Sequence, residues 1–244
     1  VDAGTNTADF KVAQYYSDGD IWTTLTSSNP LPTSISTSGI TSFTDMSYAV
    51  GELDPPGALD DYRTVNSGSW QNIANWQRSN GVAWVPATVA PTDVNANVIT
   101  VRSGYDMSSN PFGITADQLI VEAGASISIS ETTLNISDGP GVDLQCYGSI
   151  PLNTVGLAVN GIAEFFSGSS LSMEGFSNIS GAGTINLQSG SNFSISGNDD
   201  NTISGGITIN NNTTCEFNAT SPLIISGAAN FNNNSVFNWN TNAN

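Results

Sequence analysis

The sequence predicts an all-β fold, mainly a parallel β-helix of about seven coils with a 22-residue period. From residue 161 onward, glycine recurs every 22 residues, at Gly161, Gly183, Gly205 and Gly227. Apolar residues recur in the same register, as in the column Phe165, Leu187, Ile209 and Phe231. A fixed period in the twenties, with apolar pairs at i and i+2 between Gly or Asn turns, is typical of a stacked β-solenoid.

Each coil is expected to place two apolar pairs in its core. Strand side chains alternate between faces, so Ala163 and Phe165 point inward and Glu164 points to solvent. Leu171 and Met173 form the second inward pair of the same coil. The outward position is polar in every coil, at Glu164, Asn186, Thr208 and Asn230. This alternation predicts sheets with one buried and one wet face.

The same pattern extends back to about residue 97 with small irregularities. Leu119 lies 44 residues, or two coils, before Ala163. Leu144 takes the strand position between them, 25 residues after Leu119 and 19 before Ala163. An insertion at 138–141, Asp-Gly-Pro-Gly, accounts for this shift. Ile99 precedes Leu119 by 20 residues, so the β-helix is expected to span residues 97–244.

Three segments precede the β-helix. Residues 1–53 contain apolar stretches at 10–16, 21–25 and 40–50, which predict a segment of a few β-strands. The Pro-rich residues 54–61 form a stiff linker. Residues 62–96 are a Trp-rich N-terminal cap, because the end of a solenoid exposes strand edges and apolar side chains that must be covered.

The tryptophans of the cap segment allow a second interpretation. Trp70, Trp76 and Trp84 are three of the five tryptophans in the chain. Exposed indole faces stack on sugar rings, so these three residues are the candidate ligand-binding residues. The segment adjoins the first coil, which favours the cap over the sugar platform.

Charge excludes one class of partner. The chain has 4 Lys and Arg against 21 Asp and Glu, a net charge of −17, and the four cations all precede residue 103. Nucleic-acid binding needs such cations to neutralise phosphates, so no nucleic-acid partner is expected. No run of 18 apolar residues occurs, so no membrane insertion is expected either. The acidity indicates solubility and repulsion from like surfaces.

No cofactor is predicted, with calcium as the open alternative. Oxygen ligands suit calcium. The candidate ligands are Asp199, Asp200 and Asn201 on one turn, and Asp138 with Asp143 on either side of the Gly-Pro-Gly insertion. Neither cluster has the spacing of a defined calcium loop, and adjacent carboxylates on turns are commonly just solvated.

The two cysteines are not expected to form a disulfide. Cys146 falls in the third coil and Cys215 in the sixth, about 14 Å apart at the ~4.8 Å spacing of strands. A disulfide needs Cα atoms within about 7 Å. Both residues are expected to be small buried hydrophobes.

The sequence favours a protein that is not an enzyme. It contains no His, which removes Ser-His-Asp and Cys-His schemes and every His-containing metal site. A glycosidase would need only two carboxylates, and Glu122 and Glu164 are placed on one outward column, two coils and roughly 10 Å apart. No other chemically suitable residue converges on this pair, so solvated surface glutamates are the favoured interpretation.

Residues 67–70 (Ser-Gly-Ser-Trp), Trp76, Trp84, Pro91 and the stretch 99–104 resemble the opening segment of solenoid modules in large Bacteroidetes cell-surface proteins exported by type IX secretion. Residues 22–25, 40–43 and 48–51 resemble the closing strands of a β-sandwich module from such proteins. The resemblance implies an extracellular adhesin, gliding-associated protein or surface fibre. It offers no catalytic residues to transfer, and pectate-type lyases of similar fold need basic residues that this helix lacks after Arg102.

The last coil ends in Phe237 and Trp239 without an obvious polar cap. An uncovered edge templates further strands, so self-association or flanking chain is expected there. The predicted function is a non-enzymatic, extracellular structural or adhesive surface module, a fibre subunit or a segment of a giant adhesin. The alternative is a polysaccharide-binding or polysaccharide-hydrolysing β-helix. Clustered exposed tryptophans would favour binding, and a groove lined by Glu122 and Glu164 would favour hydrolysis.

Overall fold

The computed structural model describes residues 57–109, 112–197 and 201–209, together with the backbone of strands before and after these ranges. The chain divides into two compact units, Val1–Pro55 and Pro56–Asn244, which are described separately. The expected linker, residues 54–61, spans this division.

In the unit Val1–Pro55, strands β1 (Phe10–Tyr16), β2 (Ile21–Leu25) and β5 (Met46–Glu52) form an antiparallel sheet in the order β2-β1-β5. Strands β3 (Ser27–Leu31) and β4 (Ser34–Thr37) form an antiparallel pair. β1 and β2 have the bounds expected from the sequence. β5 begins later than expected, and residues 40–45 lie outside the described part of the chain.

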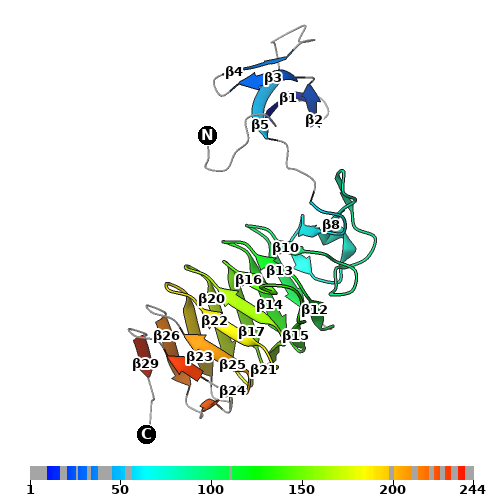
Figure 1. The fold of residues 1–244 in the computed structure, drawn as a ribbon. Coiled ribbons are helices and arrows are strands. Elements are labelled where there is room, and N and C mark those ends of the chain that lie inside the picture. Colours follow the sequence, from blue (N-terminus) through cyan, green and yellow to red (C-terminus); the bar gives the residue numbers. More distant parts are fainter. Residues whose placement is uncertain are drawn as a thin grey trace. The chain divides into compact units, whose positions relative to one another are not determined.

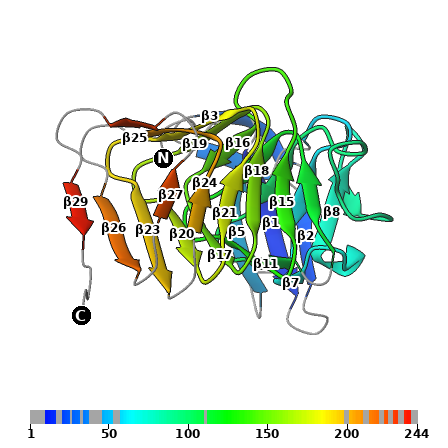
Figure 2. The ribbon, with the colours of Figure 1, turned by 90° about the horizontal axis from the view of Figure 1, so that it is seen from below.

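The unit Pro56–Asn244 is a parallel β-solenoid in which successive strands go to three different sheets (Figures 1 and 2). The first sheet contains β10 (Ile99–Val101), β13 (Leu119–Val121), β16 (Leu144–Cys146), β19 (Ile162–Phe165), β22 (Thr184–Leu187), β25 (Gly206–Ile209) and β28 (Ala229–Phe231). The second contains β11 (Asp106–Ser109), β14 (Ser126–Ser130), β17 (Ser149–Asn153), β20 (Ser170–Glu174), β23 (Asn192–Gly197), β26 (Thr214–Ala219) and β29 (Val236–Trp239). The third contains β12 (Ile114–Ala116), β15 (Thr133–Ile136), β18 (Gly156–Val159), β21 (Asn178–Ser180), β24 (Asn201–Ile203) and β27 (Leu223–Ile225).

The 22-residue period is confirmed. The first sheet advances by 22 residues at each pairing through Ala163, Ile185, Ile207 and Ala229. The second sheet does the same through Leu171, Phe193, Cys215 and Phe237. Five complete three-strand turns, from β10 to β24, lie in the ranges that the structure describes, rather than the seven or so expected. Strands β25 to β29 continue the three sheets in the same order.

The core is a column of inward side chains from all three sheets. The expected inward residues Ala163, Phe165, Leu171 and Met173 are fully buried, whereas Glu164 between the first two is not. The third sheet adds inward pairs that the sequence analysis did not identify, such as Leu134 with Ile136 on β15. Figure 2 shows β15, β18, β21, β24 and β27 of this sheet side by side. Each coil therefore has three walls.

The irregular coil has the expected register. Leu144 pairs with Leu119 on one side and with Ala163 on the other. The extra residues, which include Asp138 to Gly141, lie in the connection from β15 to β16. The loop therefore takes up the insertion while the strands stay aligned.

A column of glycines closes the turn from the first sheet to the second. Gly104, Gly124, Gly168 and Gly190 all have φ between 80° and 85°, a region that strains other residues. The N–H of Gly104 donates to the carbonyl of Gly124 (3.1 Å), and the N–H of Gly168 to that of Gly190 (2.9 Å). Neighbouring turns are thus bonded to each other along the solenoid.

The cap consists of β6 (Tyr62–Thr64), β7 (Gly68–Ser69), the 3-10 helix η2 (Ile73–Asn75), β8 (Trp76–Ser79) and β9 (Trp84–Pro86). β6 pairs parallel with β10 on one side and antiparallel with β8 on the other, and β8 pairs antiparallel with β9. The first sheet therefore ends in an antiparallel meander, which covers the edge that a further parallel coil would need.

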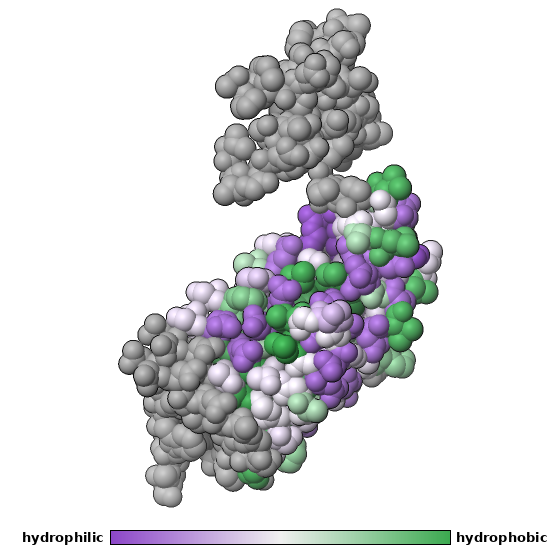
Figure 3. All heavy atoms as spheres, viewed as in Figure 1, coloured by the Kyte–Doolittle hydropathy of each residue, from purple (hydrophilic) through white to green (hydrophobic). Residues whose placement is uncertain are grey.

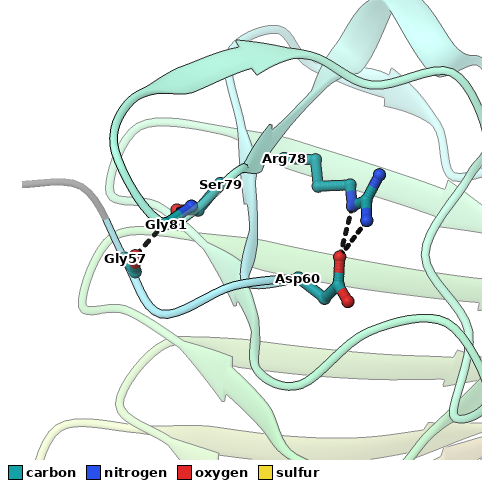
Figure 4. Close-up of polar contacts among 5 residues, drawn as sticks. All are labelled: Gly57, Asp60, Arg78, Ser79 and Gly81. Carbon is teal, nitrogen blue, oxygen red and sulfur yellow. Dashed lines mark hydrogen bonds and ion pairs between the residues drawn. The ribbon is translucent and has the colours of Figure 1, made fainter.

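Polar contacts hold the start of this unit against the cap (Figure 4). The guanidinium of Arg78 forms an ion pair with Asp60, and the hydroxyl of Ser79 donates to the carbonyl of Gly57 at 2.7 Å. The Ser79 hydroxyl also accepts from the N–H of Gly81 at 3.1 Å. β8 is thereby tied to the residues that enter the solenoid unit.

The cysteines do not lie on one sheet. Cys146 is on β16 of the first sheet, is buried and is free, and Cys215 is on β26 of the second. Burial raises the pKa of the Cys146 thiol to about 12. Cys146 is thus an inert core residue, as expected, and the side chain of Cys215 lies outside the described residues.

Candidate functional site

Two of the three candidate sugar-binding tryptophans belong to the core. Trp70 and Trp76 are 2% and 1% exposed, and their rings meet edge to face with centroids 4.7 Å apart. The indole N–H of Trp70 donates to the carbonyl of Pro91 (2.9 Å), and that of Trp76 to the carbonyl of Trp70 (2.7 Å). Neither indole presents a face to a ligand.

Trp84 is half-buried on β9, and the guanidinium of Arg63 lies over its ring, 4.2 Å from the centroid. A cation over an aromatic face is an attractive contact. The contact links the side chains of β6 and β9 across the meander. One face of Trp84 is therefore occupied by the protein itself.

Asp143 is a structural carboxylate. It is fully buried, and its Oδ1 accepts from the N–H of Gly139 (2.9 Å) and from the amide of Gln118 (3.2 Å). Its Oδ2 accepts from the N–H of Ile162 at 2.6 Å. These bonds fix the 138–141 insertion against the coils before and after it. Asp138, the proposed partner for calcium, is exposed.

Of the second calcium candidate, only Asn201 lies within the described residues. Asn201 begins β24 and is 1% exposed, and its Oδ1 accepts from the N–H of Ser177 at 3.3 Å. The prediction that Asn201 lies on a turn is wrong, because it fills an inward strand position. Asp199 and Asp200 lie outside the described residues. Nowhere in the described ranges do three or more His, Cys, Asp or Glu side chains form a group placed to hold a metal.

Asp117 is a further carboxylate at the insertion, which the sequence analysis did not single out. Its Oδ1 is buried and has no hydrogen-bond partner among the described residues. Burial and repulsion from Asp143, Asp93 and Asp138 raise the pKa of Asp117. This corner of the solenoid therefore carries concentrated negative charge.

The predicted glutamate pair does not share a column. The outward residue of β16, Gln145, pairs with Glu164 on one side but with Ile120 on the other. Glu122 follows the end of β13, where its carboxylate accepts from the N–H of Ser103 at 2.8 Å. The placement on one column is wrong because the register of β13 sets Glu122 two residues past the position opposite Glu164.

The structure instead reveals a hollow, which we call the notch, at the turn between β16 and β17. Four residues connect the paired positions Val121 and Ser126 in the coil before, and four connect Phe165 and Ser170 in the coil after. Only Tyr147 and Gly148 span the same corner in this coil. The shorter turn leaves a space of about 290 Å³ between its neighbours.

The notch is lined by one aromatic ring, small residues and one carboxylate. Its lining residues are Asp106, Gly124, Ala125, Ser126, Tyr147, Gly148, Ser149, Gly168 and Ser170. The positions Asp106, Ser126, Ser149 and Ser170 form one outward column of the second sheet. The hydroxyl of Ser126 donates to Asp106 at 2.6 Å.

Tyr147 is the prominent side chain at the notch. It is 37% exposed, and the ring of Phe166 stacks on it with centroids 4.4 Å apart and planes within 7°. Phe166 follows β19 in the next coil, so the two rings extend the coil stacking out to the surface. Phe166 thus occupies one face of Tyr147, and Tyr147 is also the only aromatic residue among the described residues that line the notch.

The spacing of inward residues in the sequence carries a signal for the notch. The inward Ile127 comes six positions after Val121, and Leu171 comes six after Phe165, but Ile150 comes only four after Cys146. A turn two residues shorter than its neighbours cannot fill the same space. The aromatic residues of this turn column, Tyr147 and Phe166, were also visible in the sequence once the register was known.

One face of the solenoid and cap is mixed in character. On the face that Figure 3 shows, hydrophobic residues of the described part lie in small groups among hydrophilic ones. None of the helices in the described ranges has the length and apolar character needed to cross a bilayer. Comparison with protein-family models, with curated proteins and with solved structures finds no match.

Proposed function

We propose that this chain is a non-enzymatic, extracellular module that has a structural or adhesive role at a cell surface. The observation that supports the proposal best is the in-register stack, in which each coil bonds only to its neighbours along one axis. Such a stack is a stiff rod that displays the same outward positions again and again. A surface module needs to extend away from the cell and to present its outward residues to a partner, and such a rod does both.

The outward columns support the same proposal. On the first sheet they carry Gln145, Glu164, Asn186 and Thr208 in consecutive coils. On the second sheet Ser172 pairs with Ser194, again outward. A polar surface with a net charge of −17 keeps such a rod soluble and apart from like surfaces.

The hydrolytic alternative has less support. Hydrolysis of a glycosidic bond needs two carboxylates that face one substrate. Glu122 and Glu164 occupy different columns, and Glu122 is engaged with the backbone of the preceding turn. The described residues therefore offer no pair for that reaction at the predicted place.

The finer assignment to surface proteins exported by type IX secretion is part of this proposal, and it rests on the sequence resemblance. Assembly through the edge strands β27, β28 and β29 also stays a prediction. Both concern the native setting of the chain, so the decisive experiment uses native material.

The test is electron microscopy of intact source cells labelled with gold-coupled antibody against this protein, together with attachment assays of cells that lack the gene. We expect label on the outer surface and weaker attachment of the mutant cells. Label confined to the cell interior, or surface label with unchanged attachment and no fibre lost, would contradict the proposal.

A further inference from the structure

We propose that the notch at Tyr147 binds a neutral saccharide. This inference names a ligand class for the adhesive role, and it rests on that role for the setting in which the ligand is met. Three features of the notch lead to it: its shape, its chemistry and its charge.

The shape is preformed. The N–H of Tyr147 donates to the carbonyl of Val121 (2.8 Å), and that of Ser149 to the carbonyl of Ala125 (3.0 Å). Gly148 forms the floor, where a Cβ would lie 2.3 Å from the carbonyl oxygen of Ala125. The floor is therefore backbone held by backbone, and little ordering is needed when a ligand enters.

The size suits a small ring. The space of about 290 Å³ is just below the range of roughly 300–1,000 Å³ found for small-molecule sites. The flanking glycines Gly124 and Gly168 are exposed, so the notch faces solvent. A terminal sugar or a short segment of a chain fits these conditions better than a large ligand.

The chemistry matches a sugar ring, which has an apolar C–H face and an edge of hydroxyls. Tyr147 supplies an aromatic face, with its other side fixed by Phe166. Ser149 and Ser170 place hydroxyl-bearing side chains along the same hollow, and Asp106 adds acceptor oxygens. One aromatic surface with a few polar groups is the usual composition of a small-molecule site.

Charge selects a neutral sugar over an acidic one. Within the described ranges, the residues that line the notch include a carboxylate, Asp106, and neither Lys nor Arg. The whole chain carries a net charge of −17. An acidic sugar would meet repulsion without a cation to pair with. A metal ion is disfavoured too, because the Asp106 carboxylate stands alone in the lining and already accepts from Ser126.

The test measures binding of a panel of neutral oligosaccharides, made of gluco-, manno-, galacto- and xylo-tetraoses, to the full chain by calorimetry and saturation-transfer NMR. Tetragalacturonate serves as the acidic probe. We expect at least one neutral tetraose to bind, and Tyr147→Ala to weaken it by about tenfold or more. Tyr147→Phe keeps the aromatic face and should bind within about threefold of the wild type.

Two matched pairs control for the fold. Ser149→Gln on β17 fills the notch and should abolish binding. Ser172→Gln places the same side chain outside the notch, on β20, which is the neighbour of β17 in the second sheet. Tyr105→Ala removes a tyrosine from another turn that does not line the notch. Circular dichroism checks that every variant keeps the wild-type spectrum. Absence of binding by all neutral probes, tighter binding of tetragalacturonate, or equal binding by Tyr147→Ala and the wild type would overturn the inference.

The test of the saccharide site and the test of the proposed surface role can fail independently. Cells that carry Tyr147→Ala at the native locus can be compared with cells that lack the gene. Normal attachment with Tyr147→Ala but weak attachment without the gene would overturn the saccharide site and leave the surface role standing. Tetraose binding that depends on Tyr147 in a protein found only inside cells would do the reverse.

Discussion

The coils from β19 to β28 and the coil that begins at β16 are built on one plan but differ in their connections. In the former, the first and second sheets advance by 22 residues at every pairing. In the latter, an insertion precedes β16 and a two-residue shortening follows it. The strands stay aligned in both. The packed core thus keeps the strands in register in both, while differences in chain length are taken up by the connecting turns.

The largest effect is expected from the core of a regular coil. Phe165→Ala removes a fully buried ring and should lower the free energy of unfolding by about 3–5 kcal/mol. The adjacent outward substitution Glu164→Ala should change it by no more than about 0.5 kcal/mol. Urea denaturation of the two variants measures both. Similar losses at the two positions would contradict the inward and outward assignment.

The insertion should depend on Asp143 almost as strongly. Asp143→Ala leaves the N–H groups of Gly139 and Ile162 without their acceptor, at a cost of about 2–4 kcal/mol. Asp138→Ala, in the same loop but exposed, should cost less than about 0.5 kcal/mol. Urea denaturation of the two variants measures both free energies of unfolding. Equally small losses for Asp143→Ala and Asp138→Ala would contradict the role of the buried carboxylate in holding the loop.

The two kinds of turn should respond differently to an added methyl group. Gly148→Ala places a Cβ against the backbone of the preceding coil and should cost about 1–3 kcal/mol. Gly168→Ala meets no atom within 4 Å but has a φ of 85°, so it should cost about 1 kcal/mol through strain alone. A crystal structure of Gly148→Ala should show a displaced turn. An unmoved turn with wild-type stability would contradict the close contact.

The smallest effect concerns charge at the insertion. The pKa of Asp117 is raised in the folded chain by burial and by Asp143, Asp93 and Asp138, so its ionised form is disfavoured there. The stability linked to this shift is complete below the unfolded pKa, near 3.8, and is lost as the pH rises through the folded value. Asp117→Asn should therefore raise Tm slightly at pH 7 and leave it unchanged near pH 3. A gain of equal size at both pH values would argue against titration of Asp117.

The sequence was sufficient for the regular coils because each core position is repeated in its neighbours. The same reasoning located the shift at Leu144 and the loop that causes it. It missed the third sheet, whose short strands repeat with less regular spacing. Ile179 and Ile203, for example, are inward partners in neighbouring coils and lie 24 residues apart. Repetition, rather than strand propensity, made the prediction possible.

The candidate site was harder to predict because it arises from a deletion. The tryptophans were candidate ligand-binding residues because of their residue type, yet Trp70 and Trp76 are buried in the core of the cap. Tyr147 and Phe166 can be recognised as stacked neighbours only when the register shows that they follow paired strands in consecutive coils. A turn shortened by two residues leaves only a change in the spacing of the inward residues, and that change can be interpreted only once the register of the neighbouring coils is known.

The hydrogen bonds that join the coils run along the axis of the solenoid, because each strand from β10 to β26 pairs with its counterpart in the next coil. Tension applied to the two ends of the stack is carried by the inter-coil seams in series, so they separate one at a time rather than all together. Under such a pull the chain would lengthen by peeling off single coils, each releasing a segment about 22 residues long.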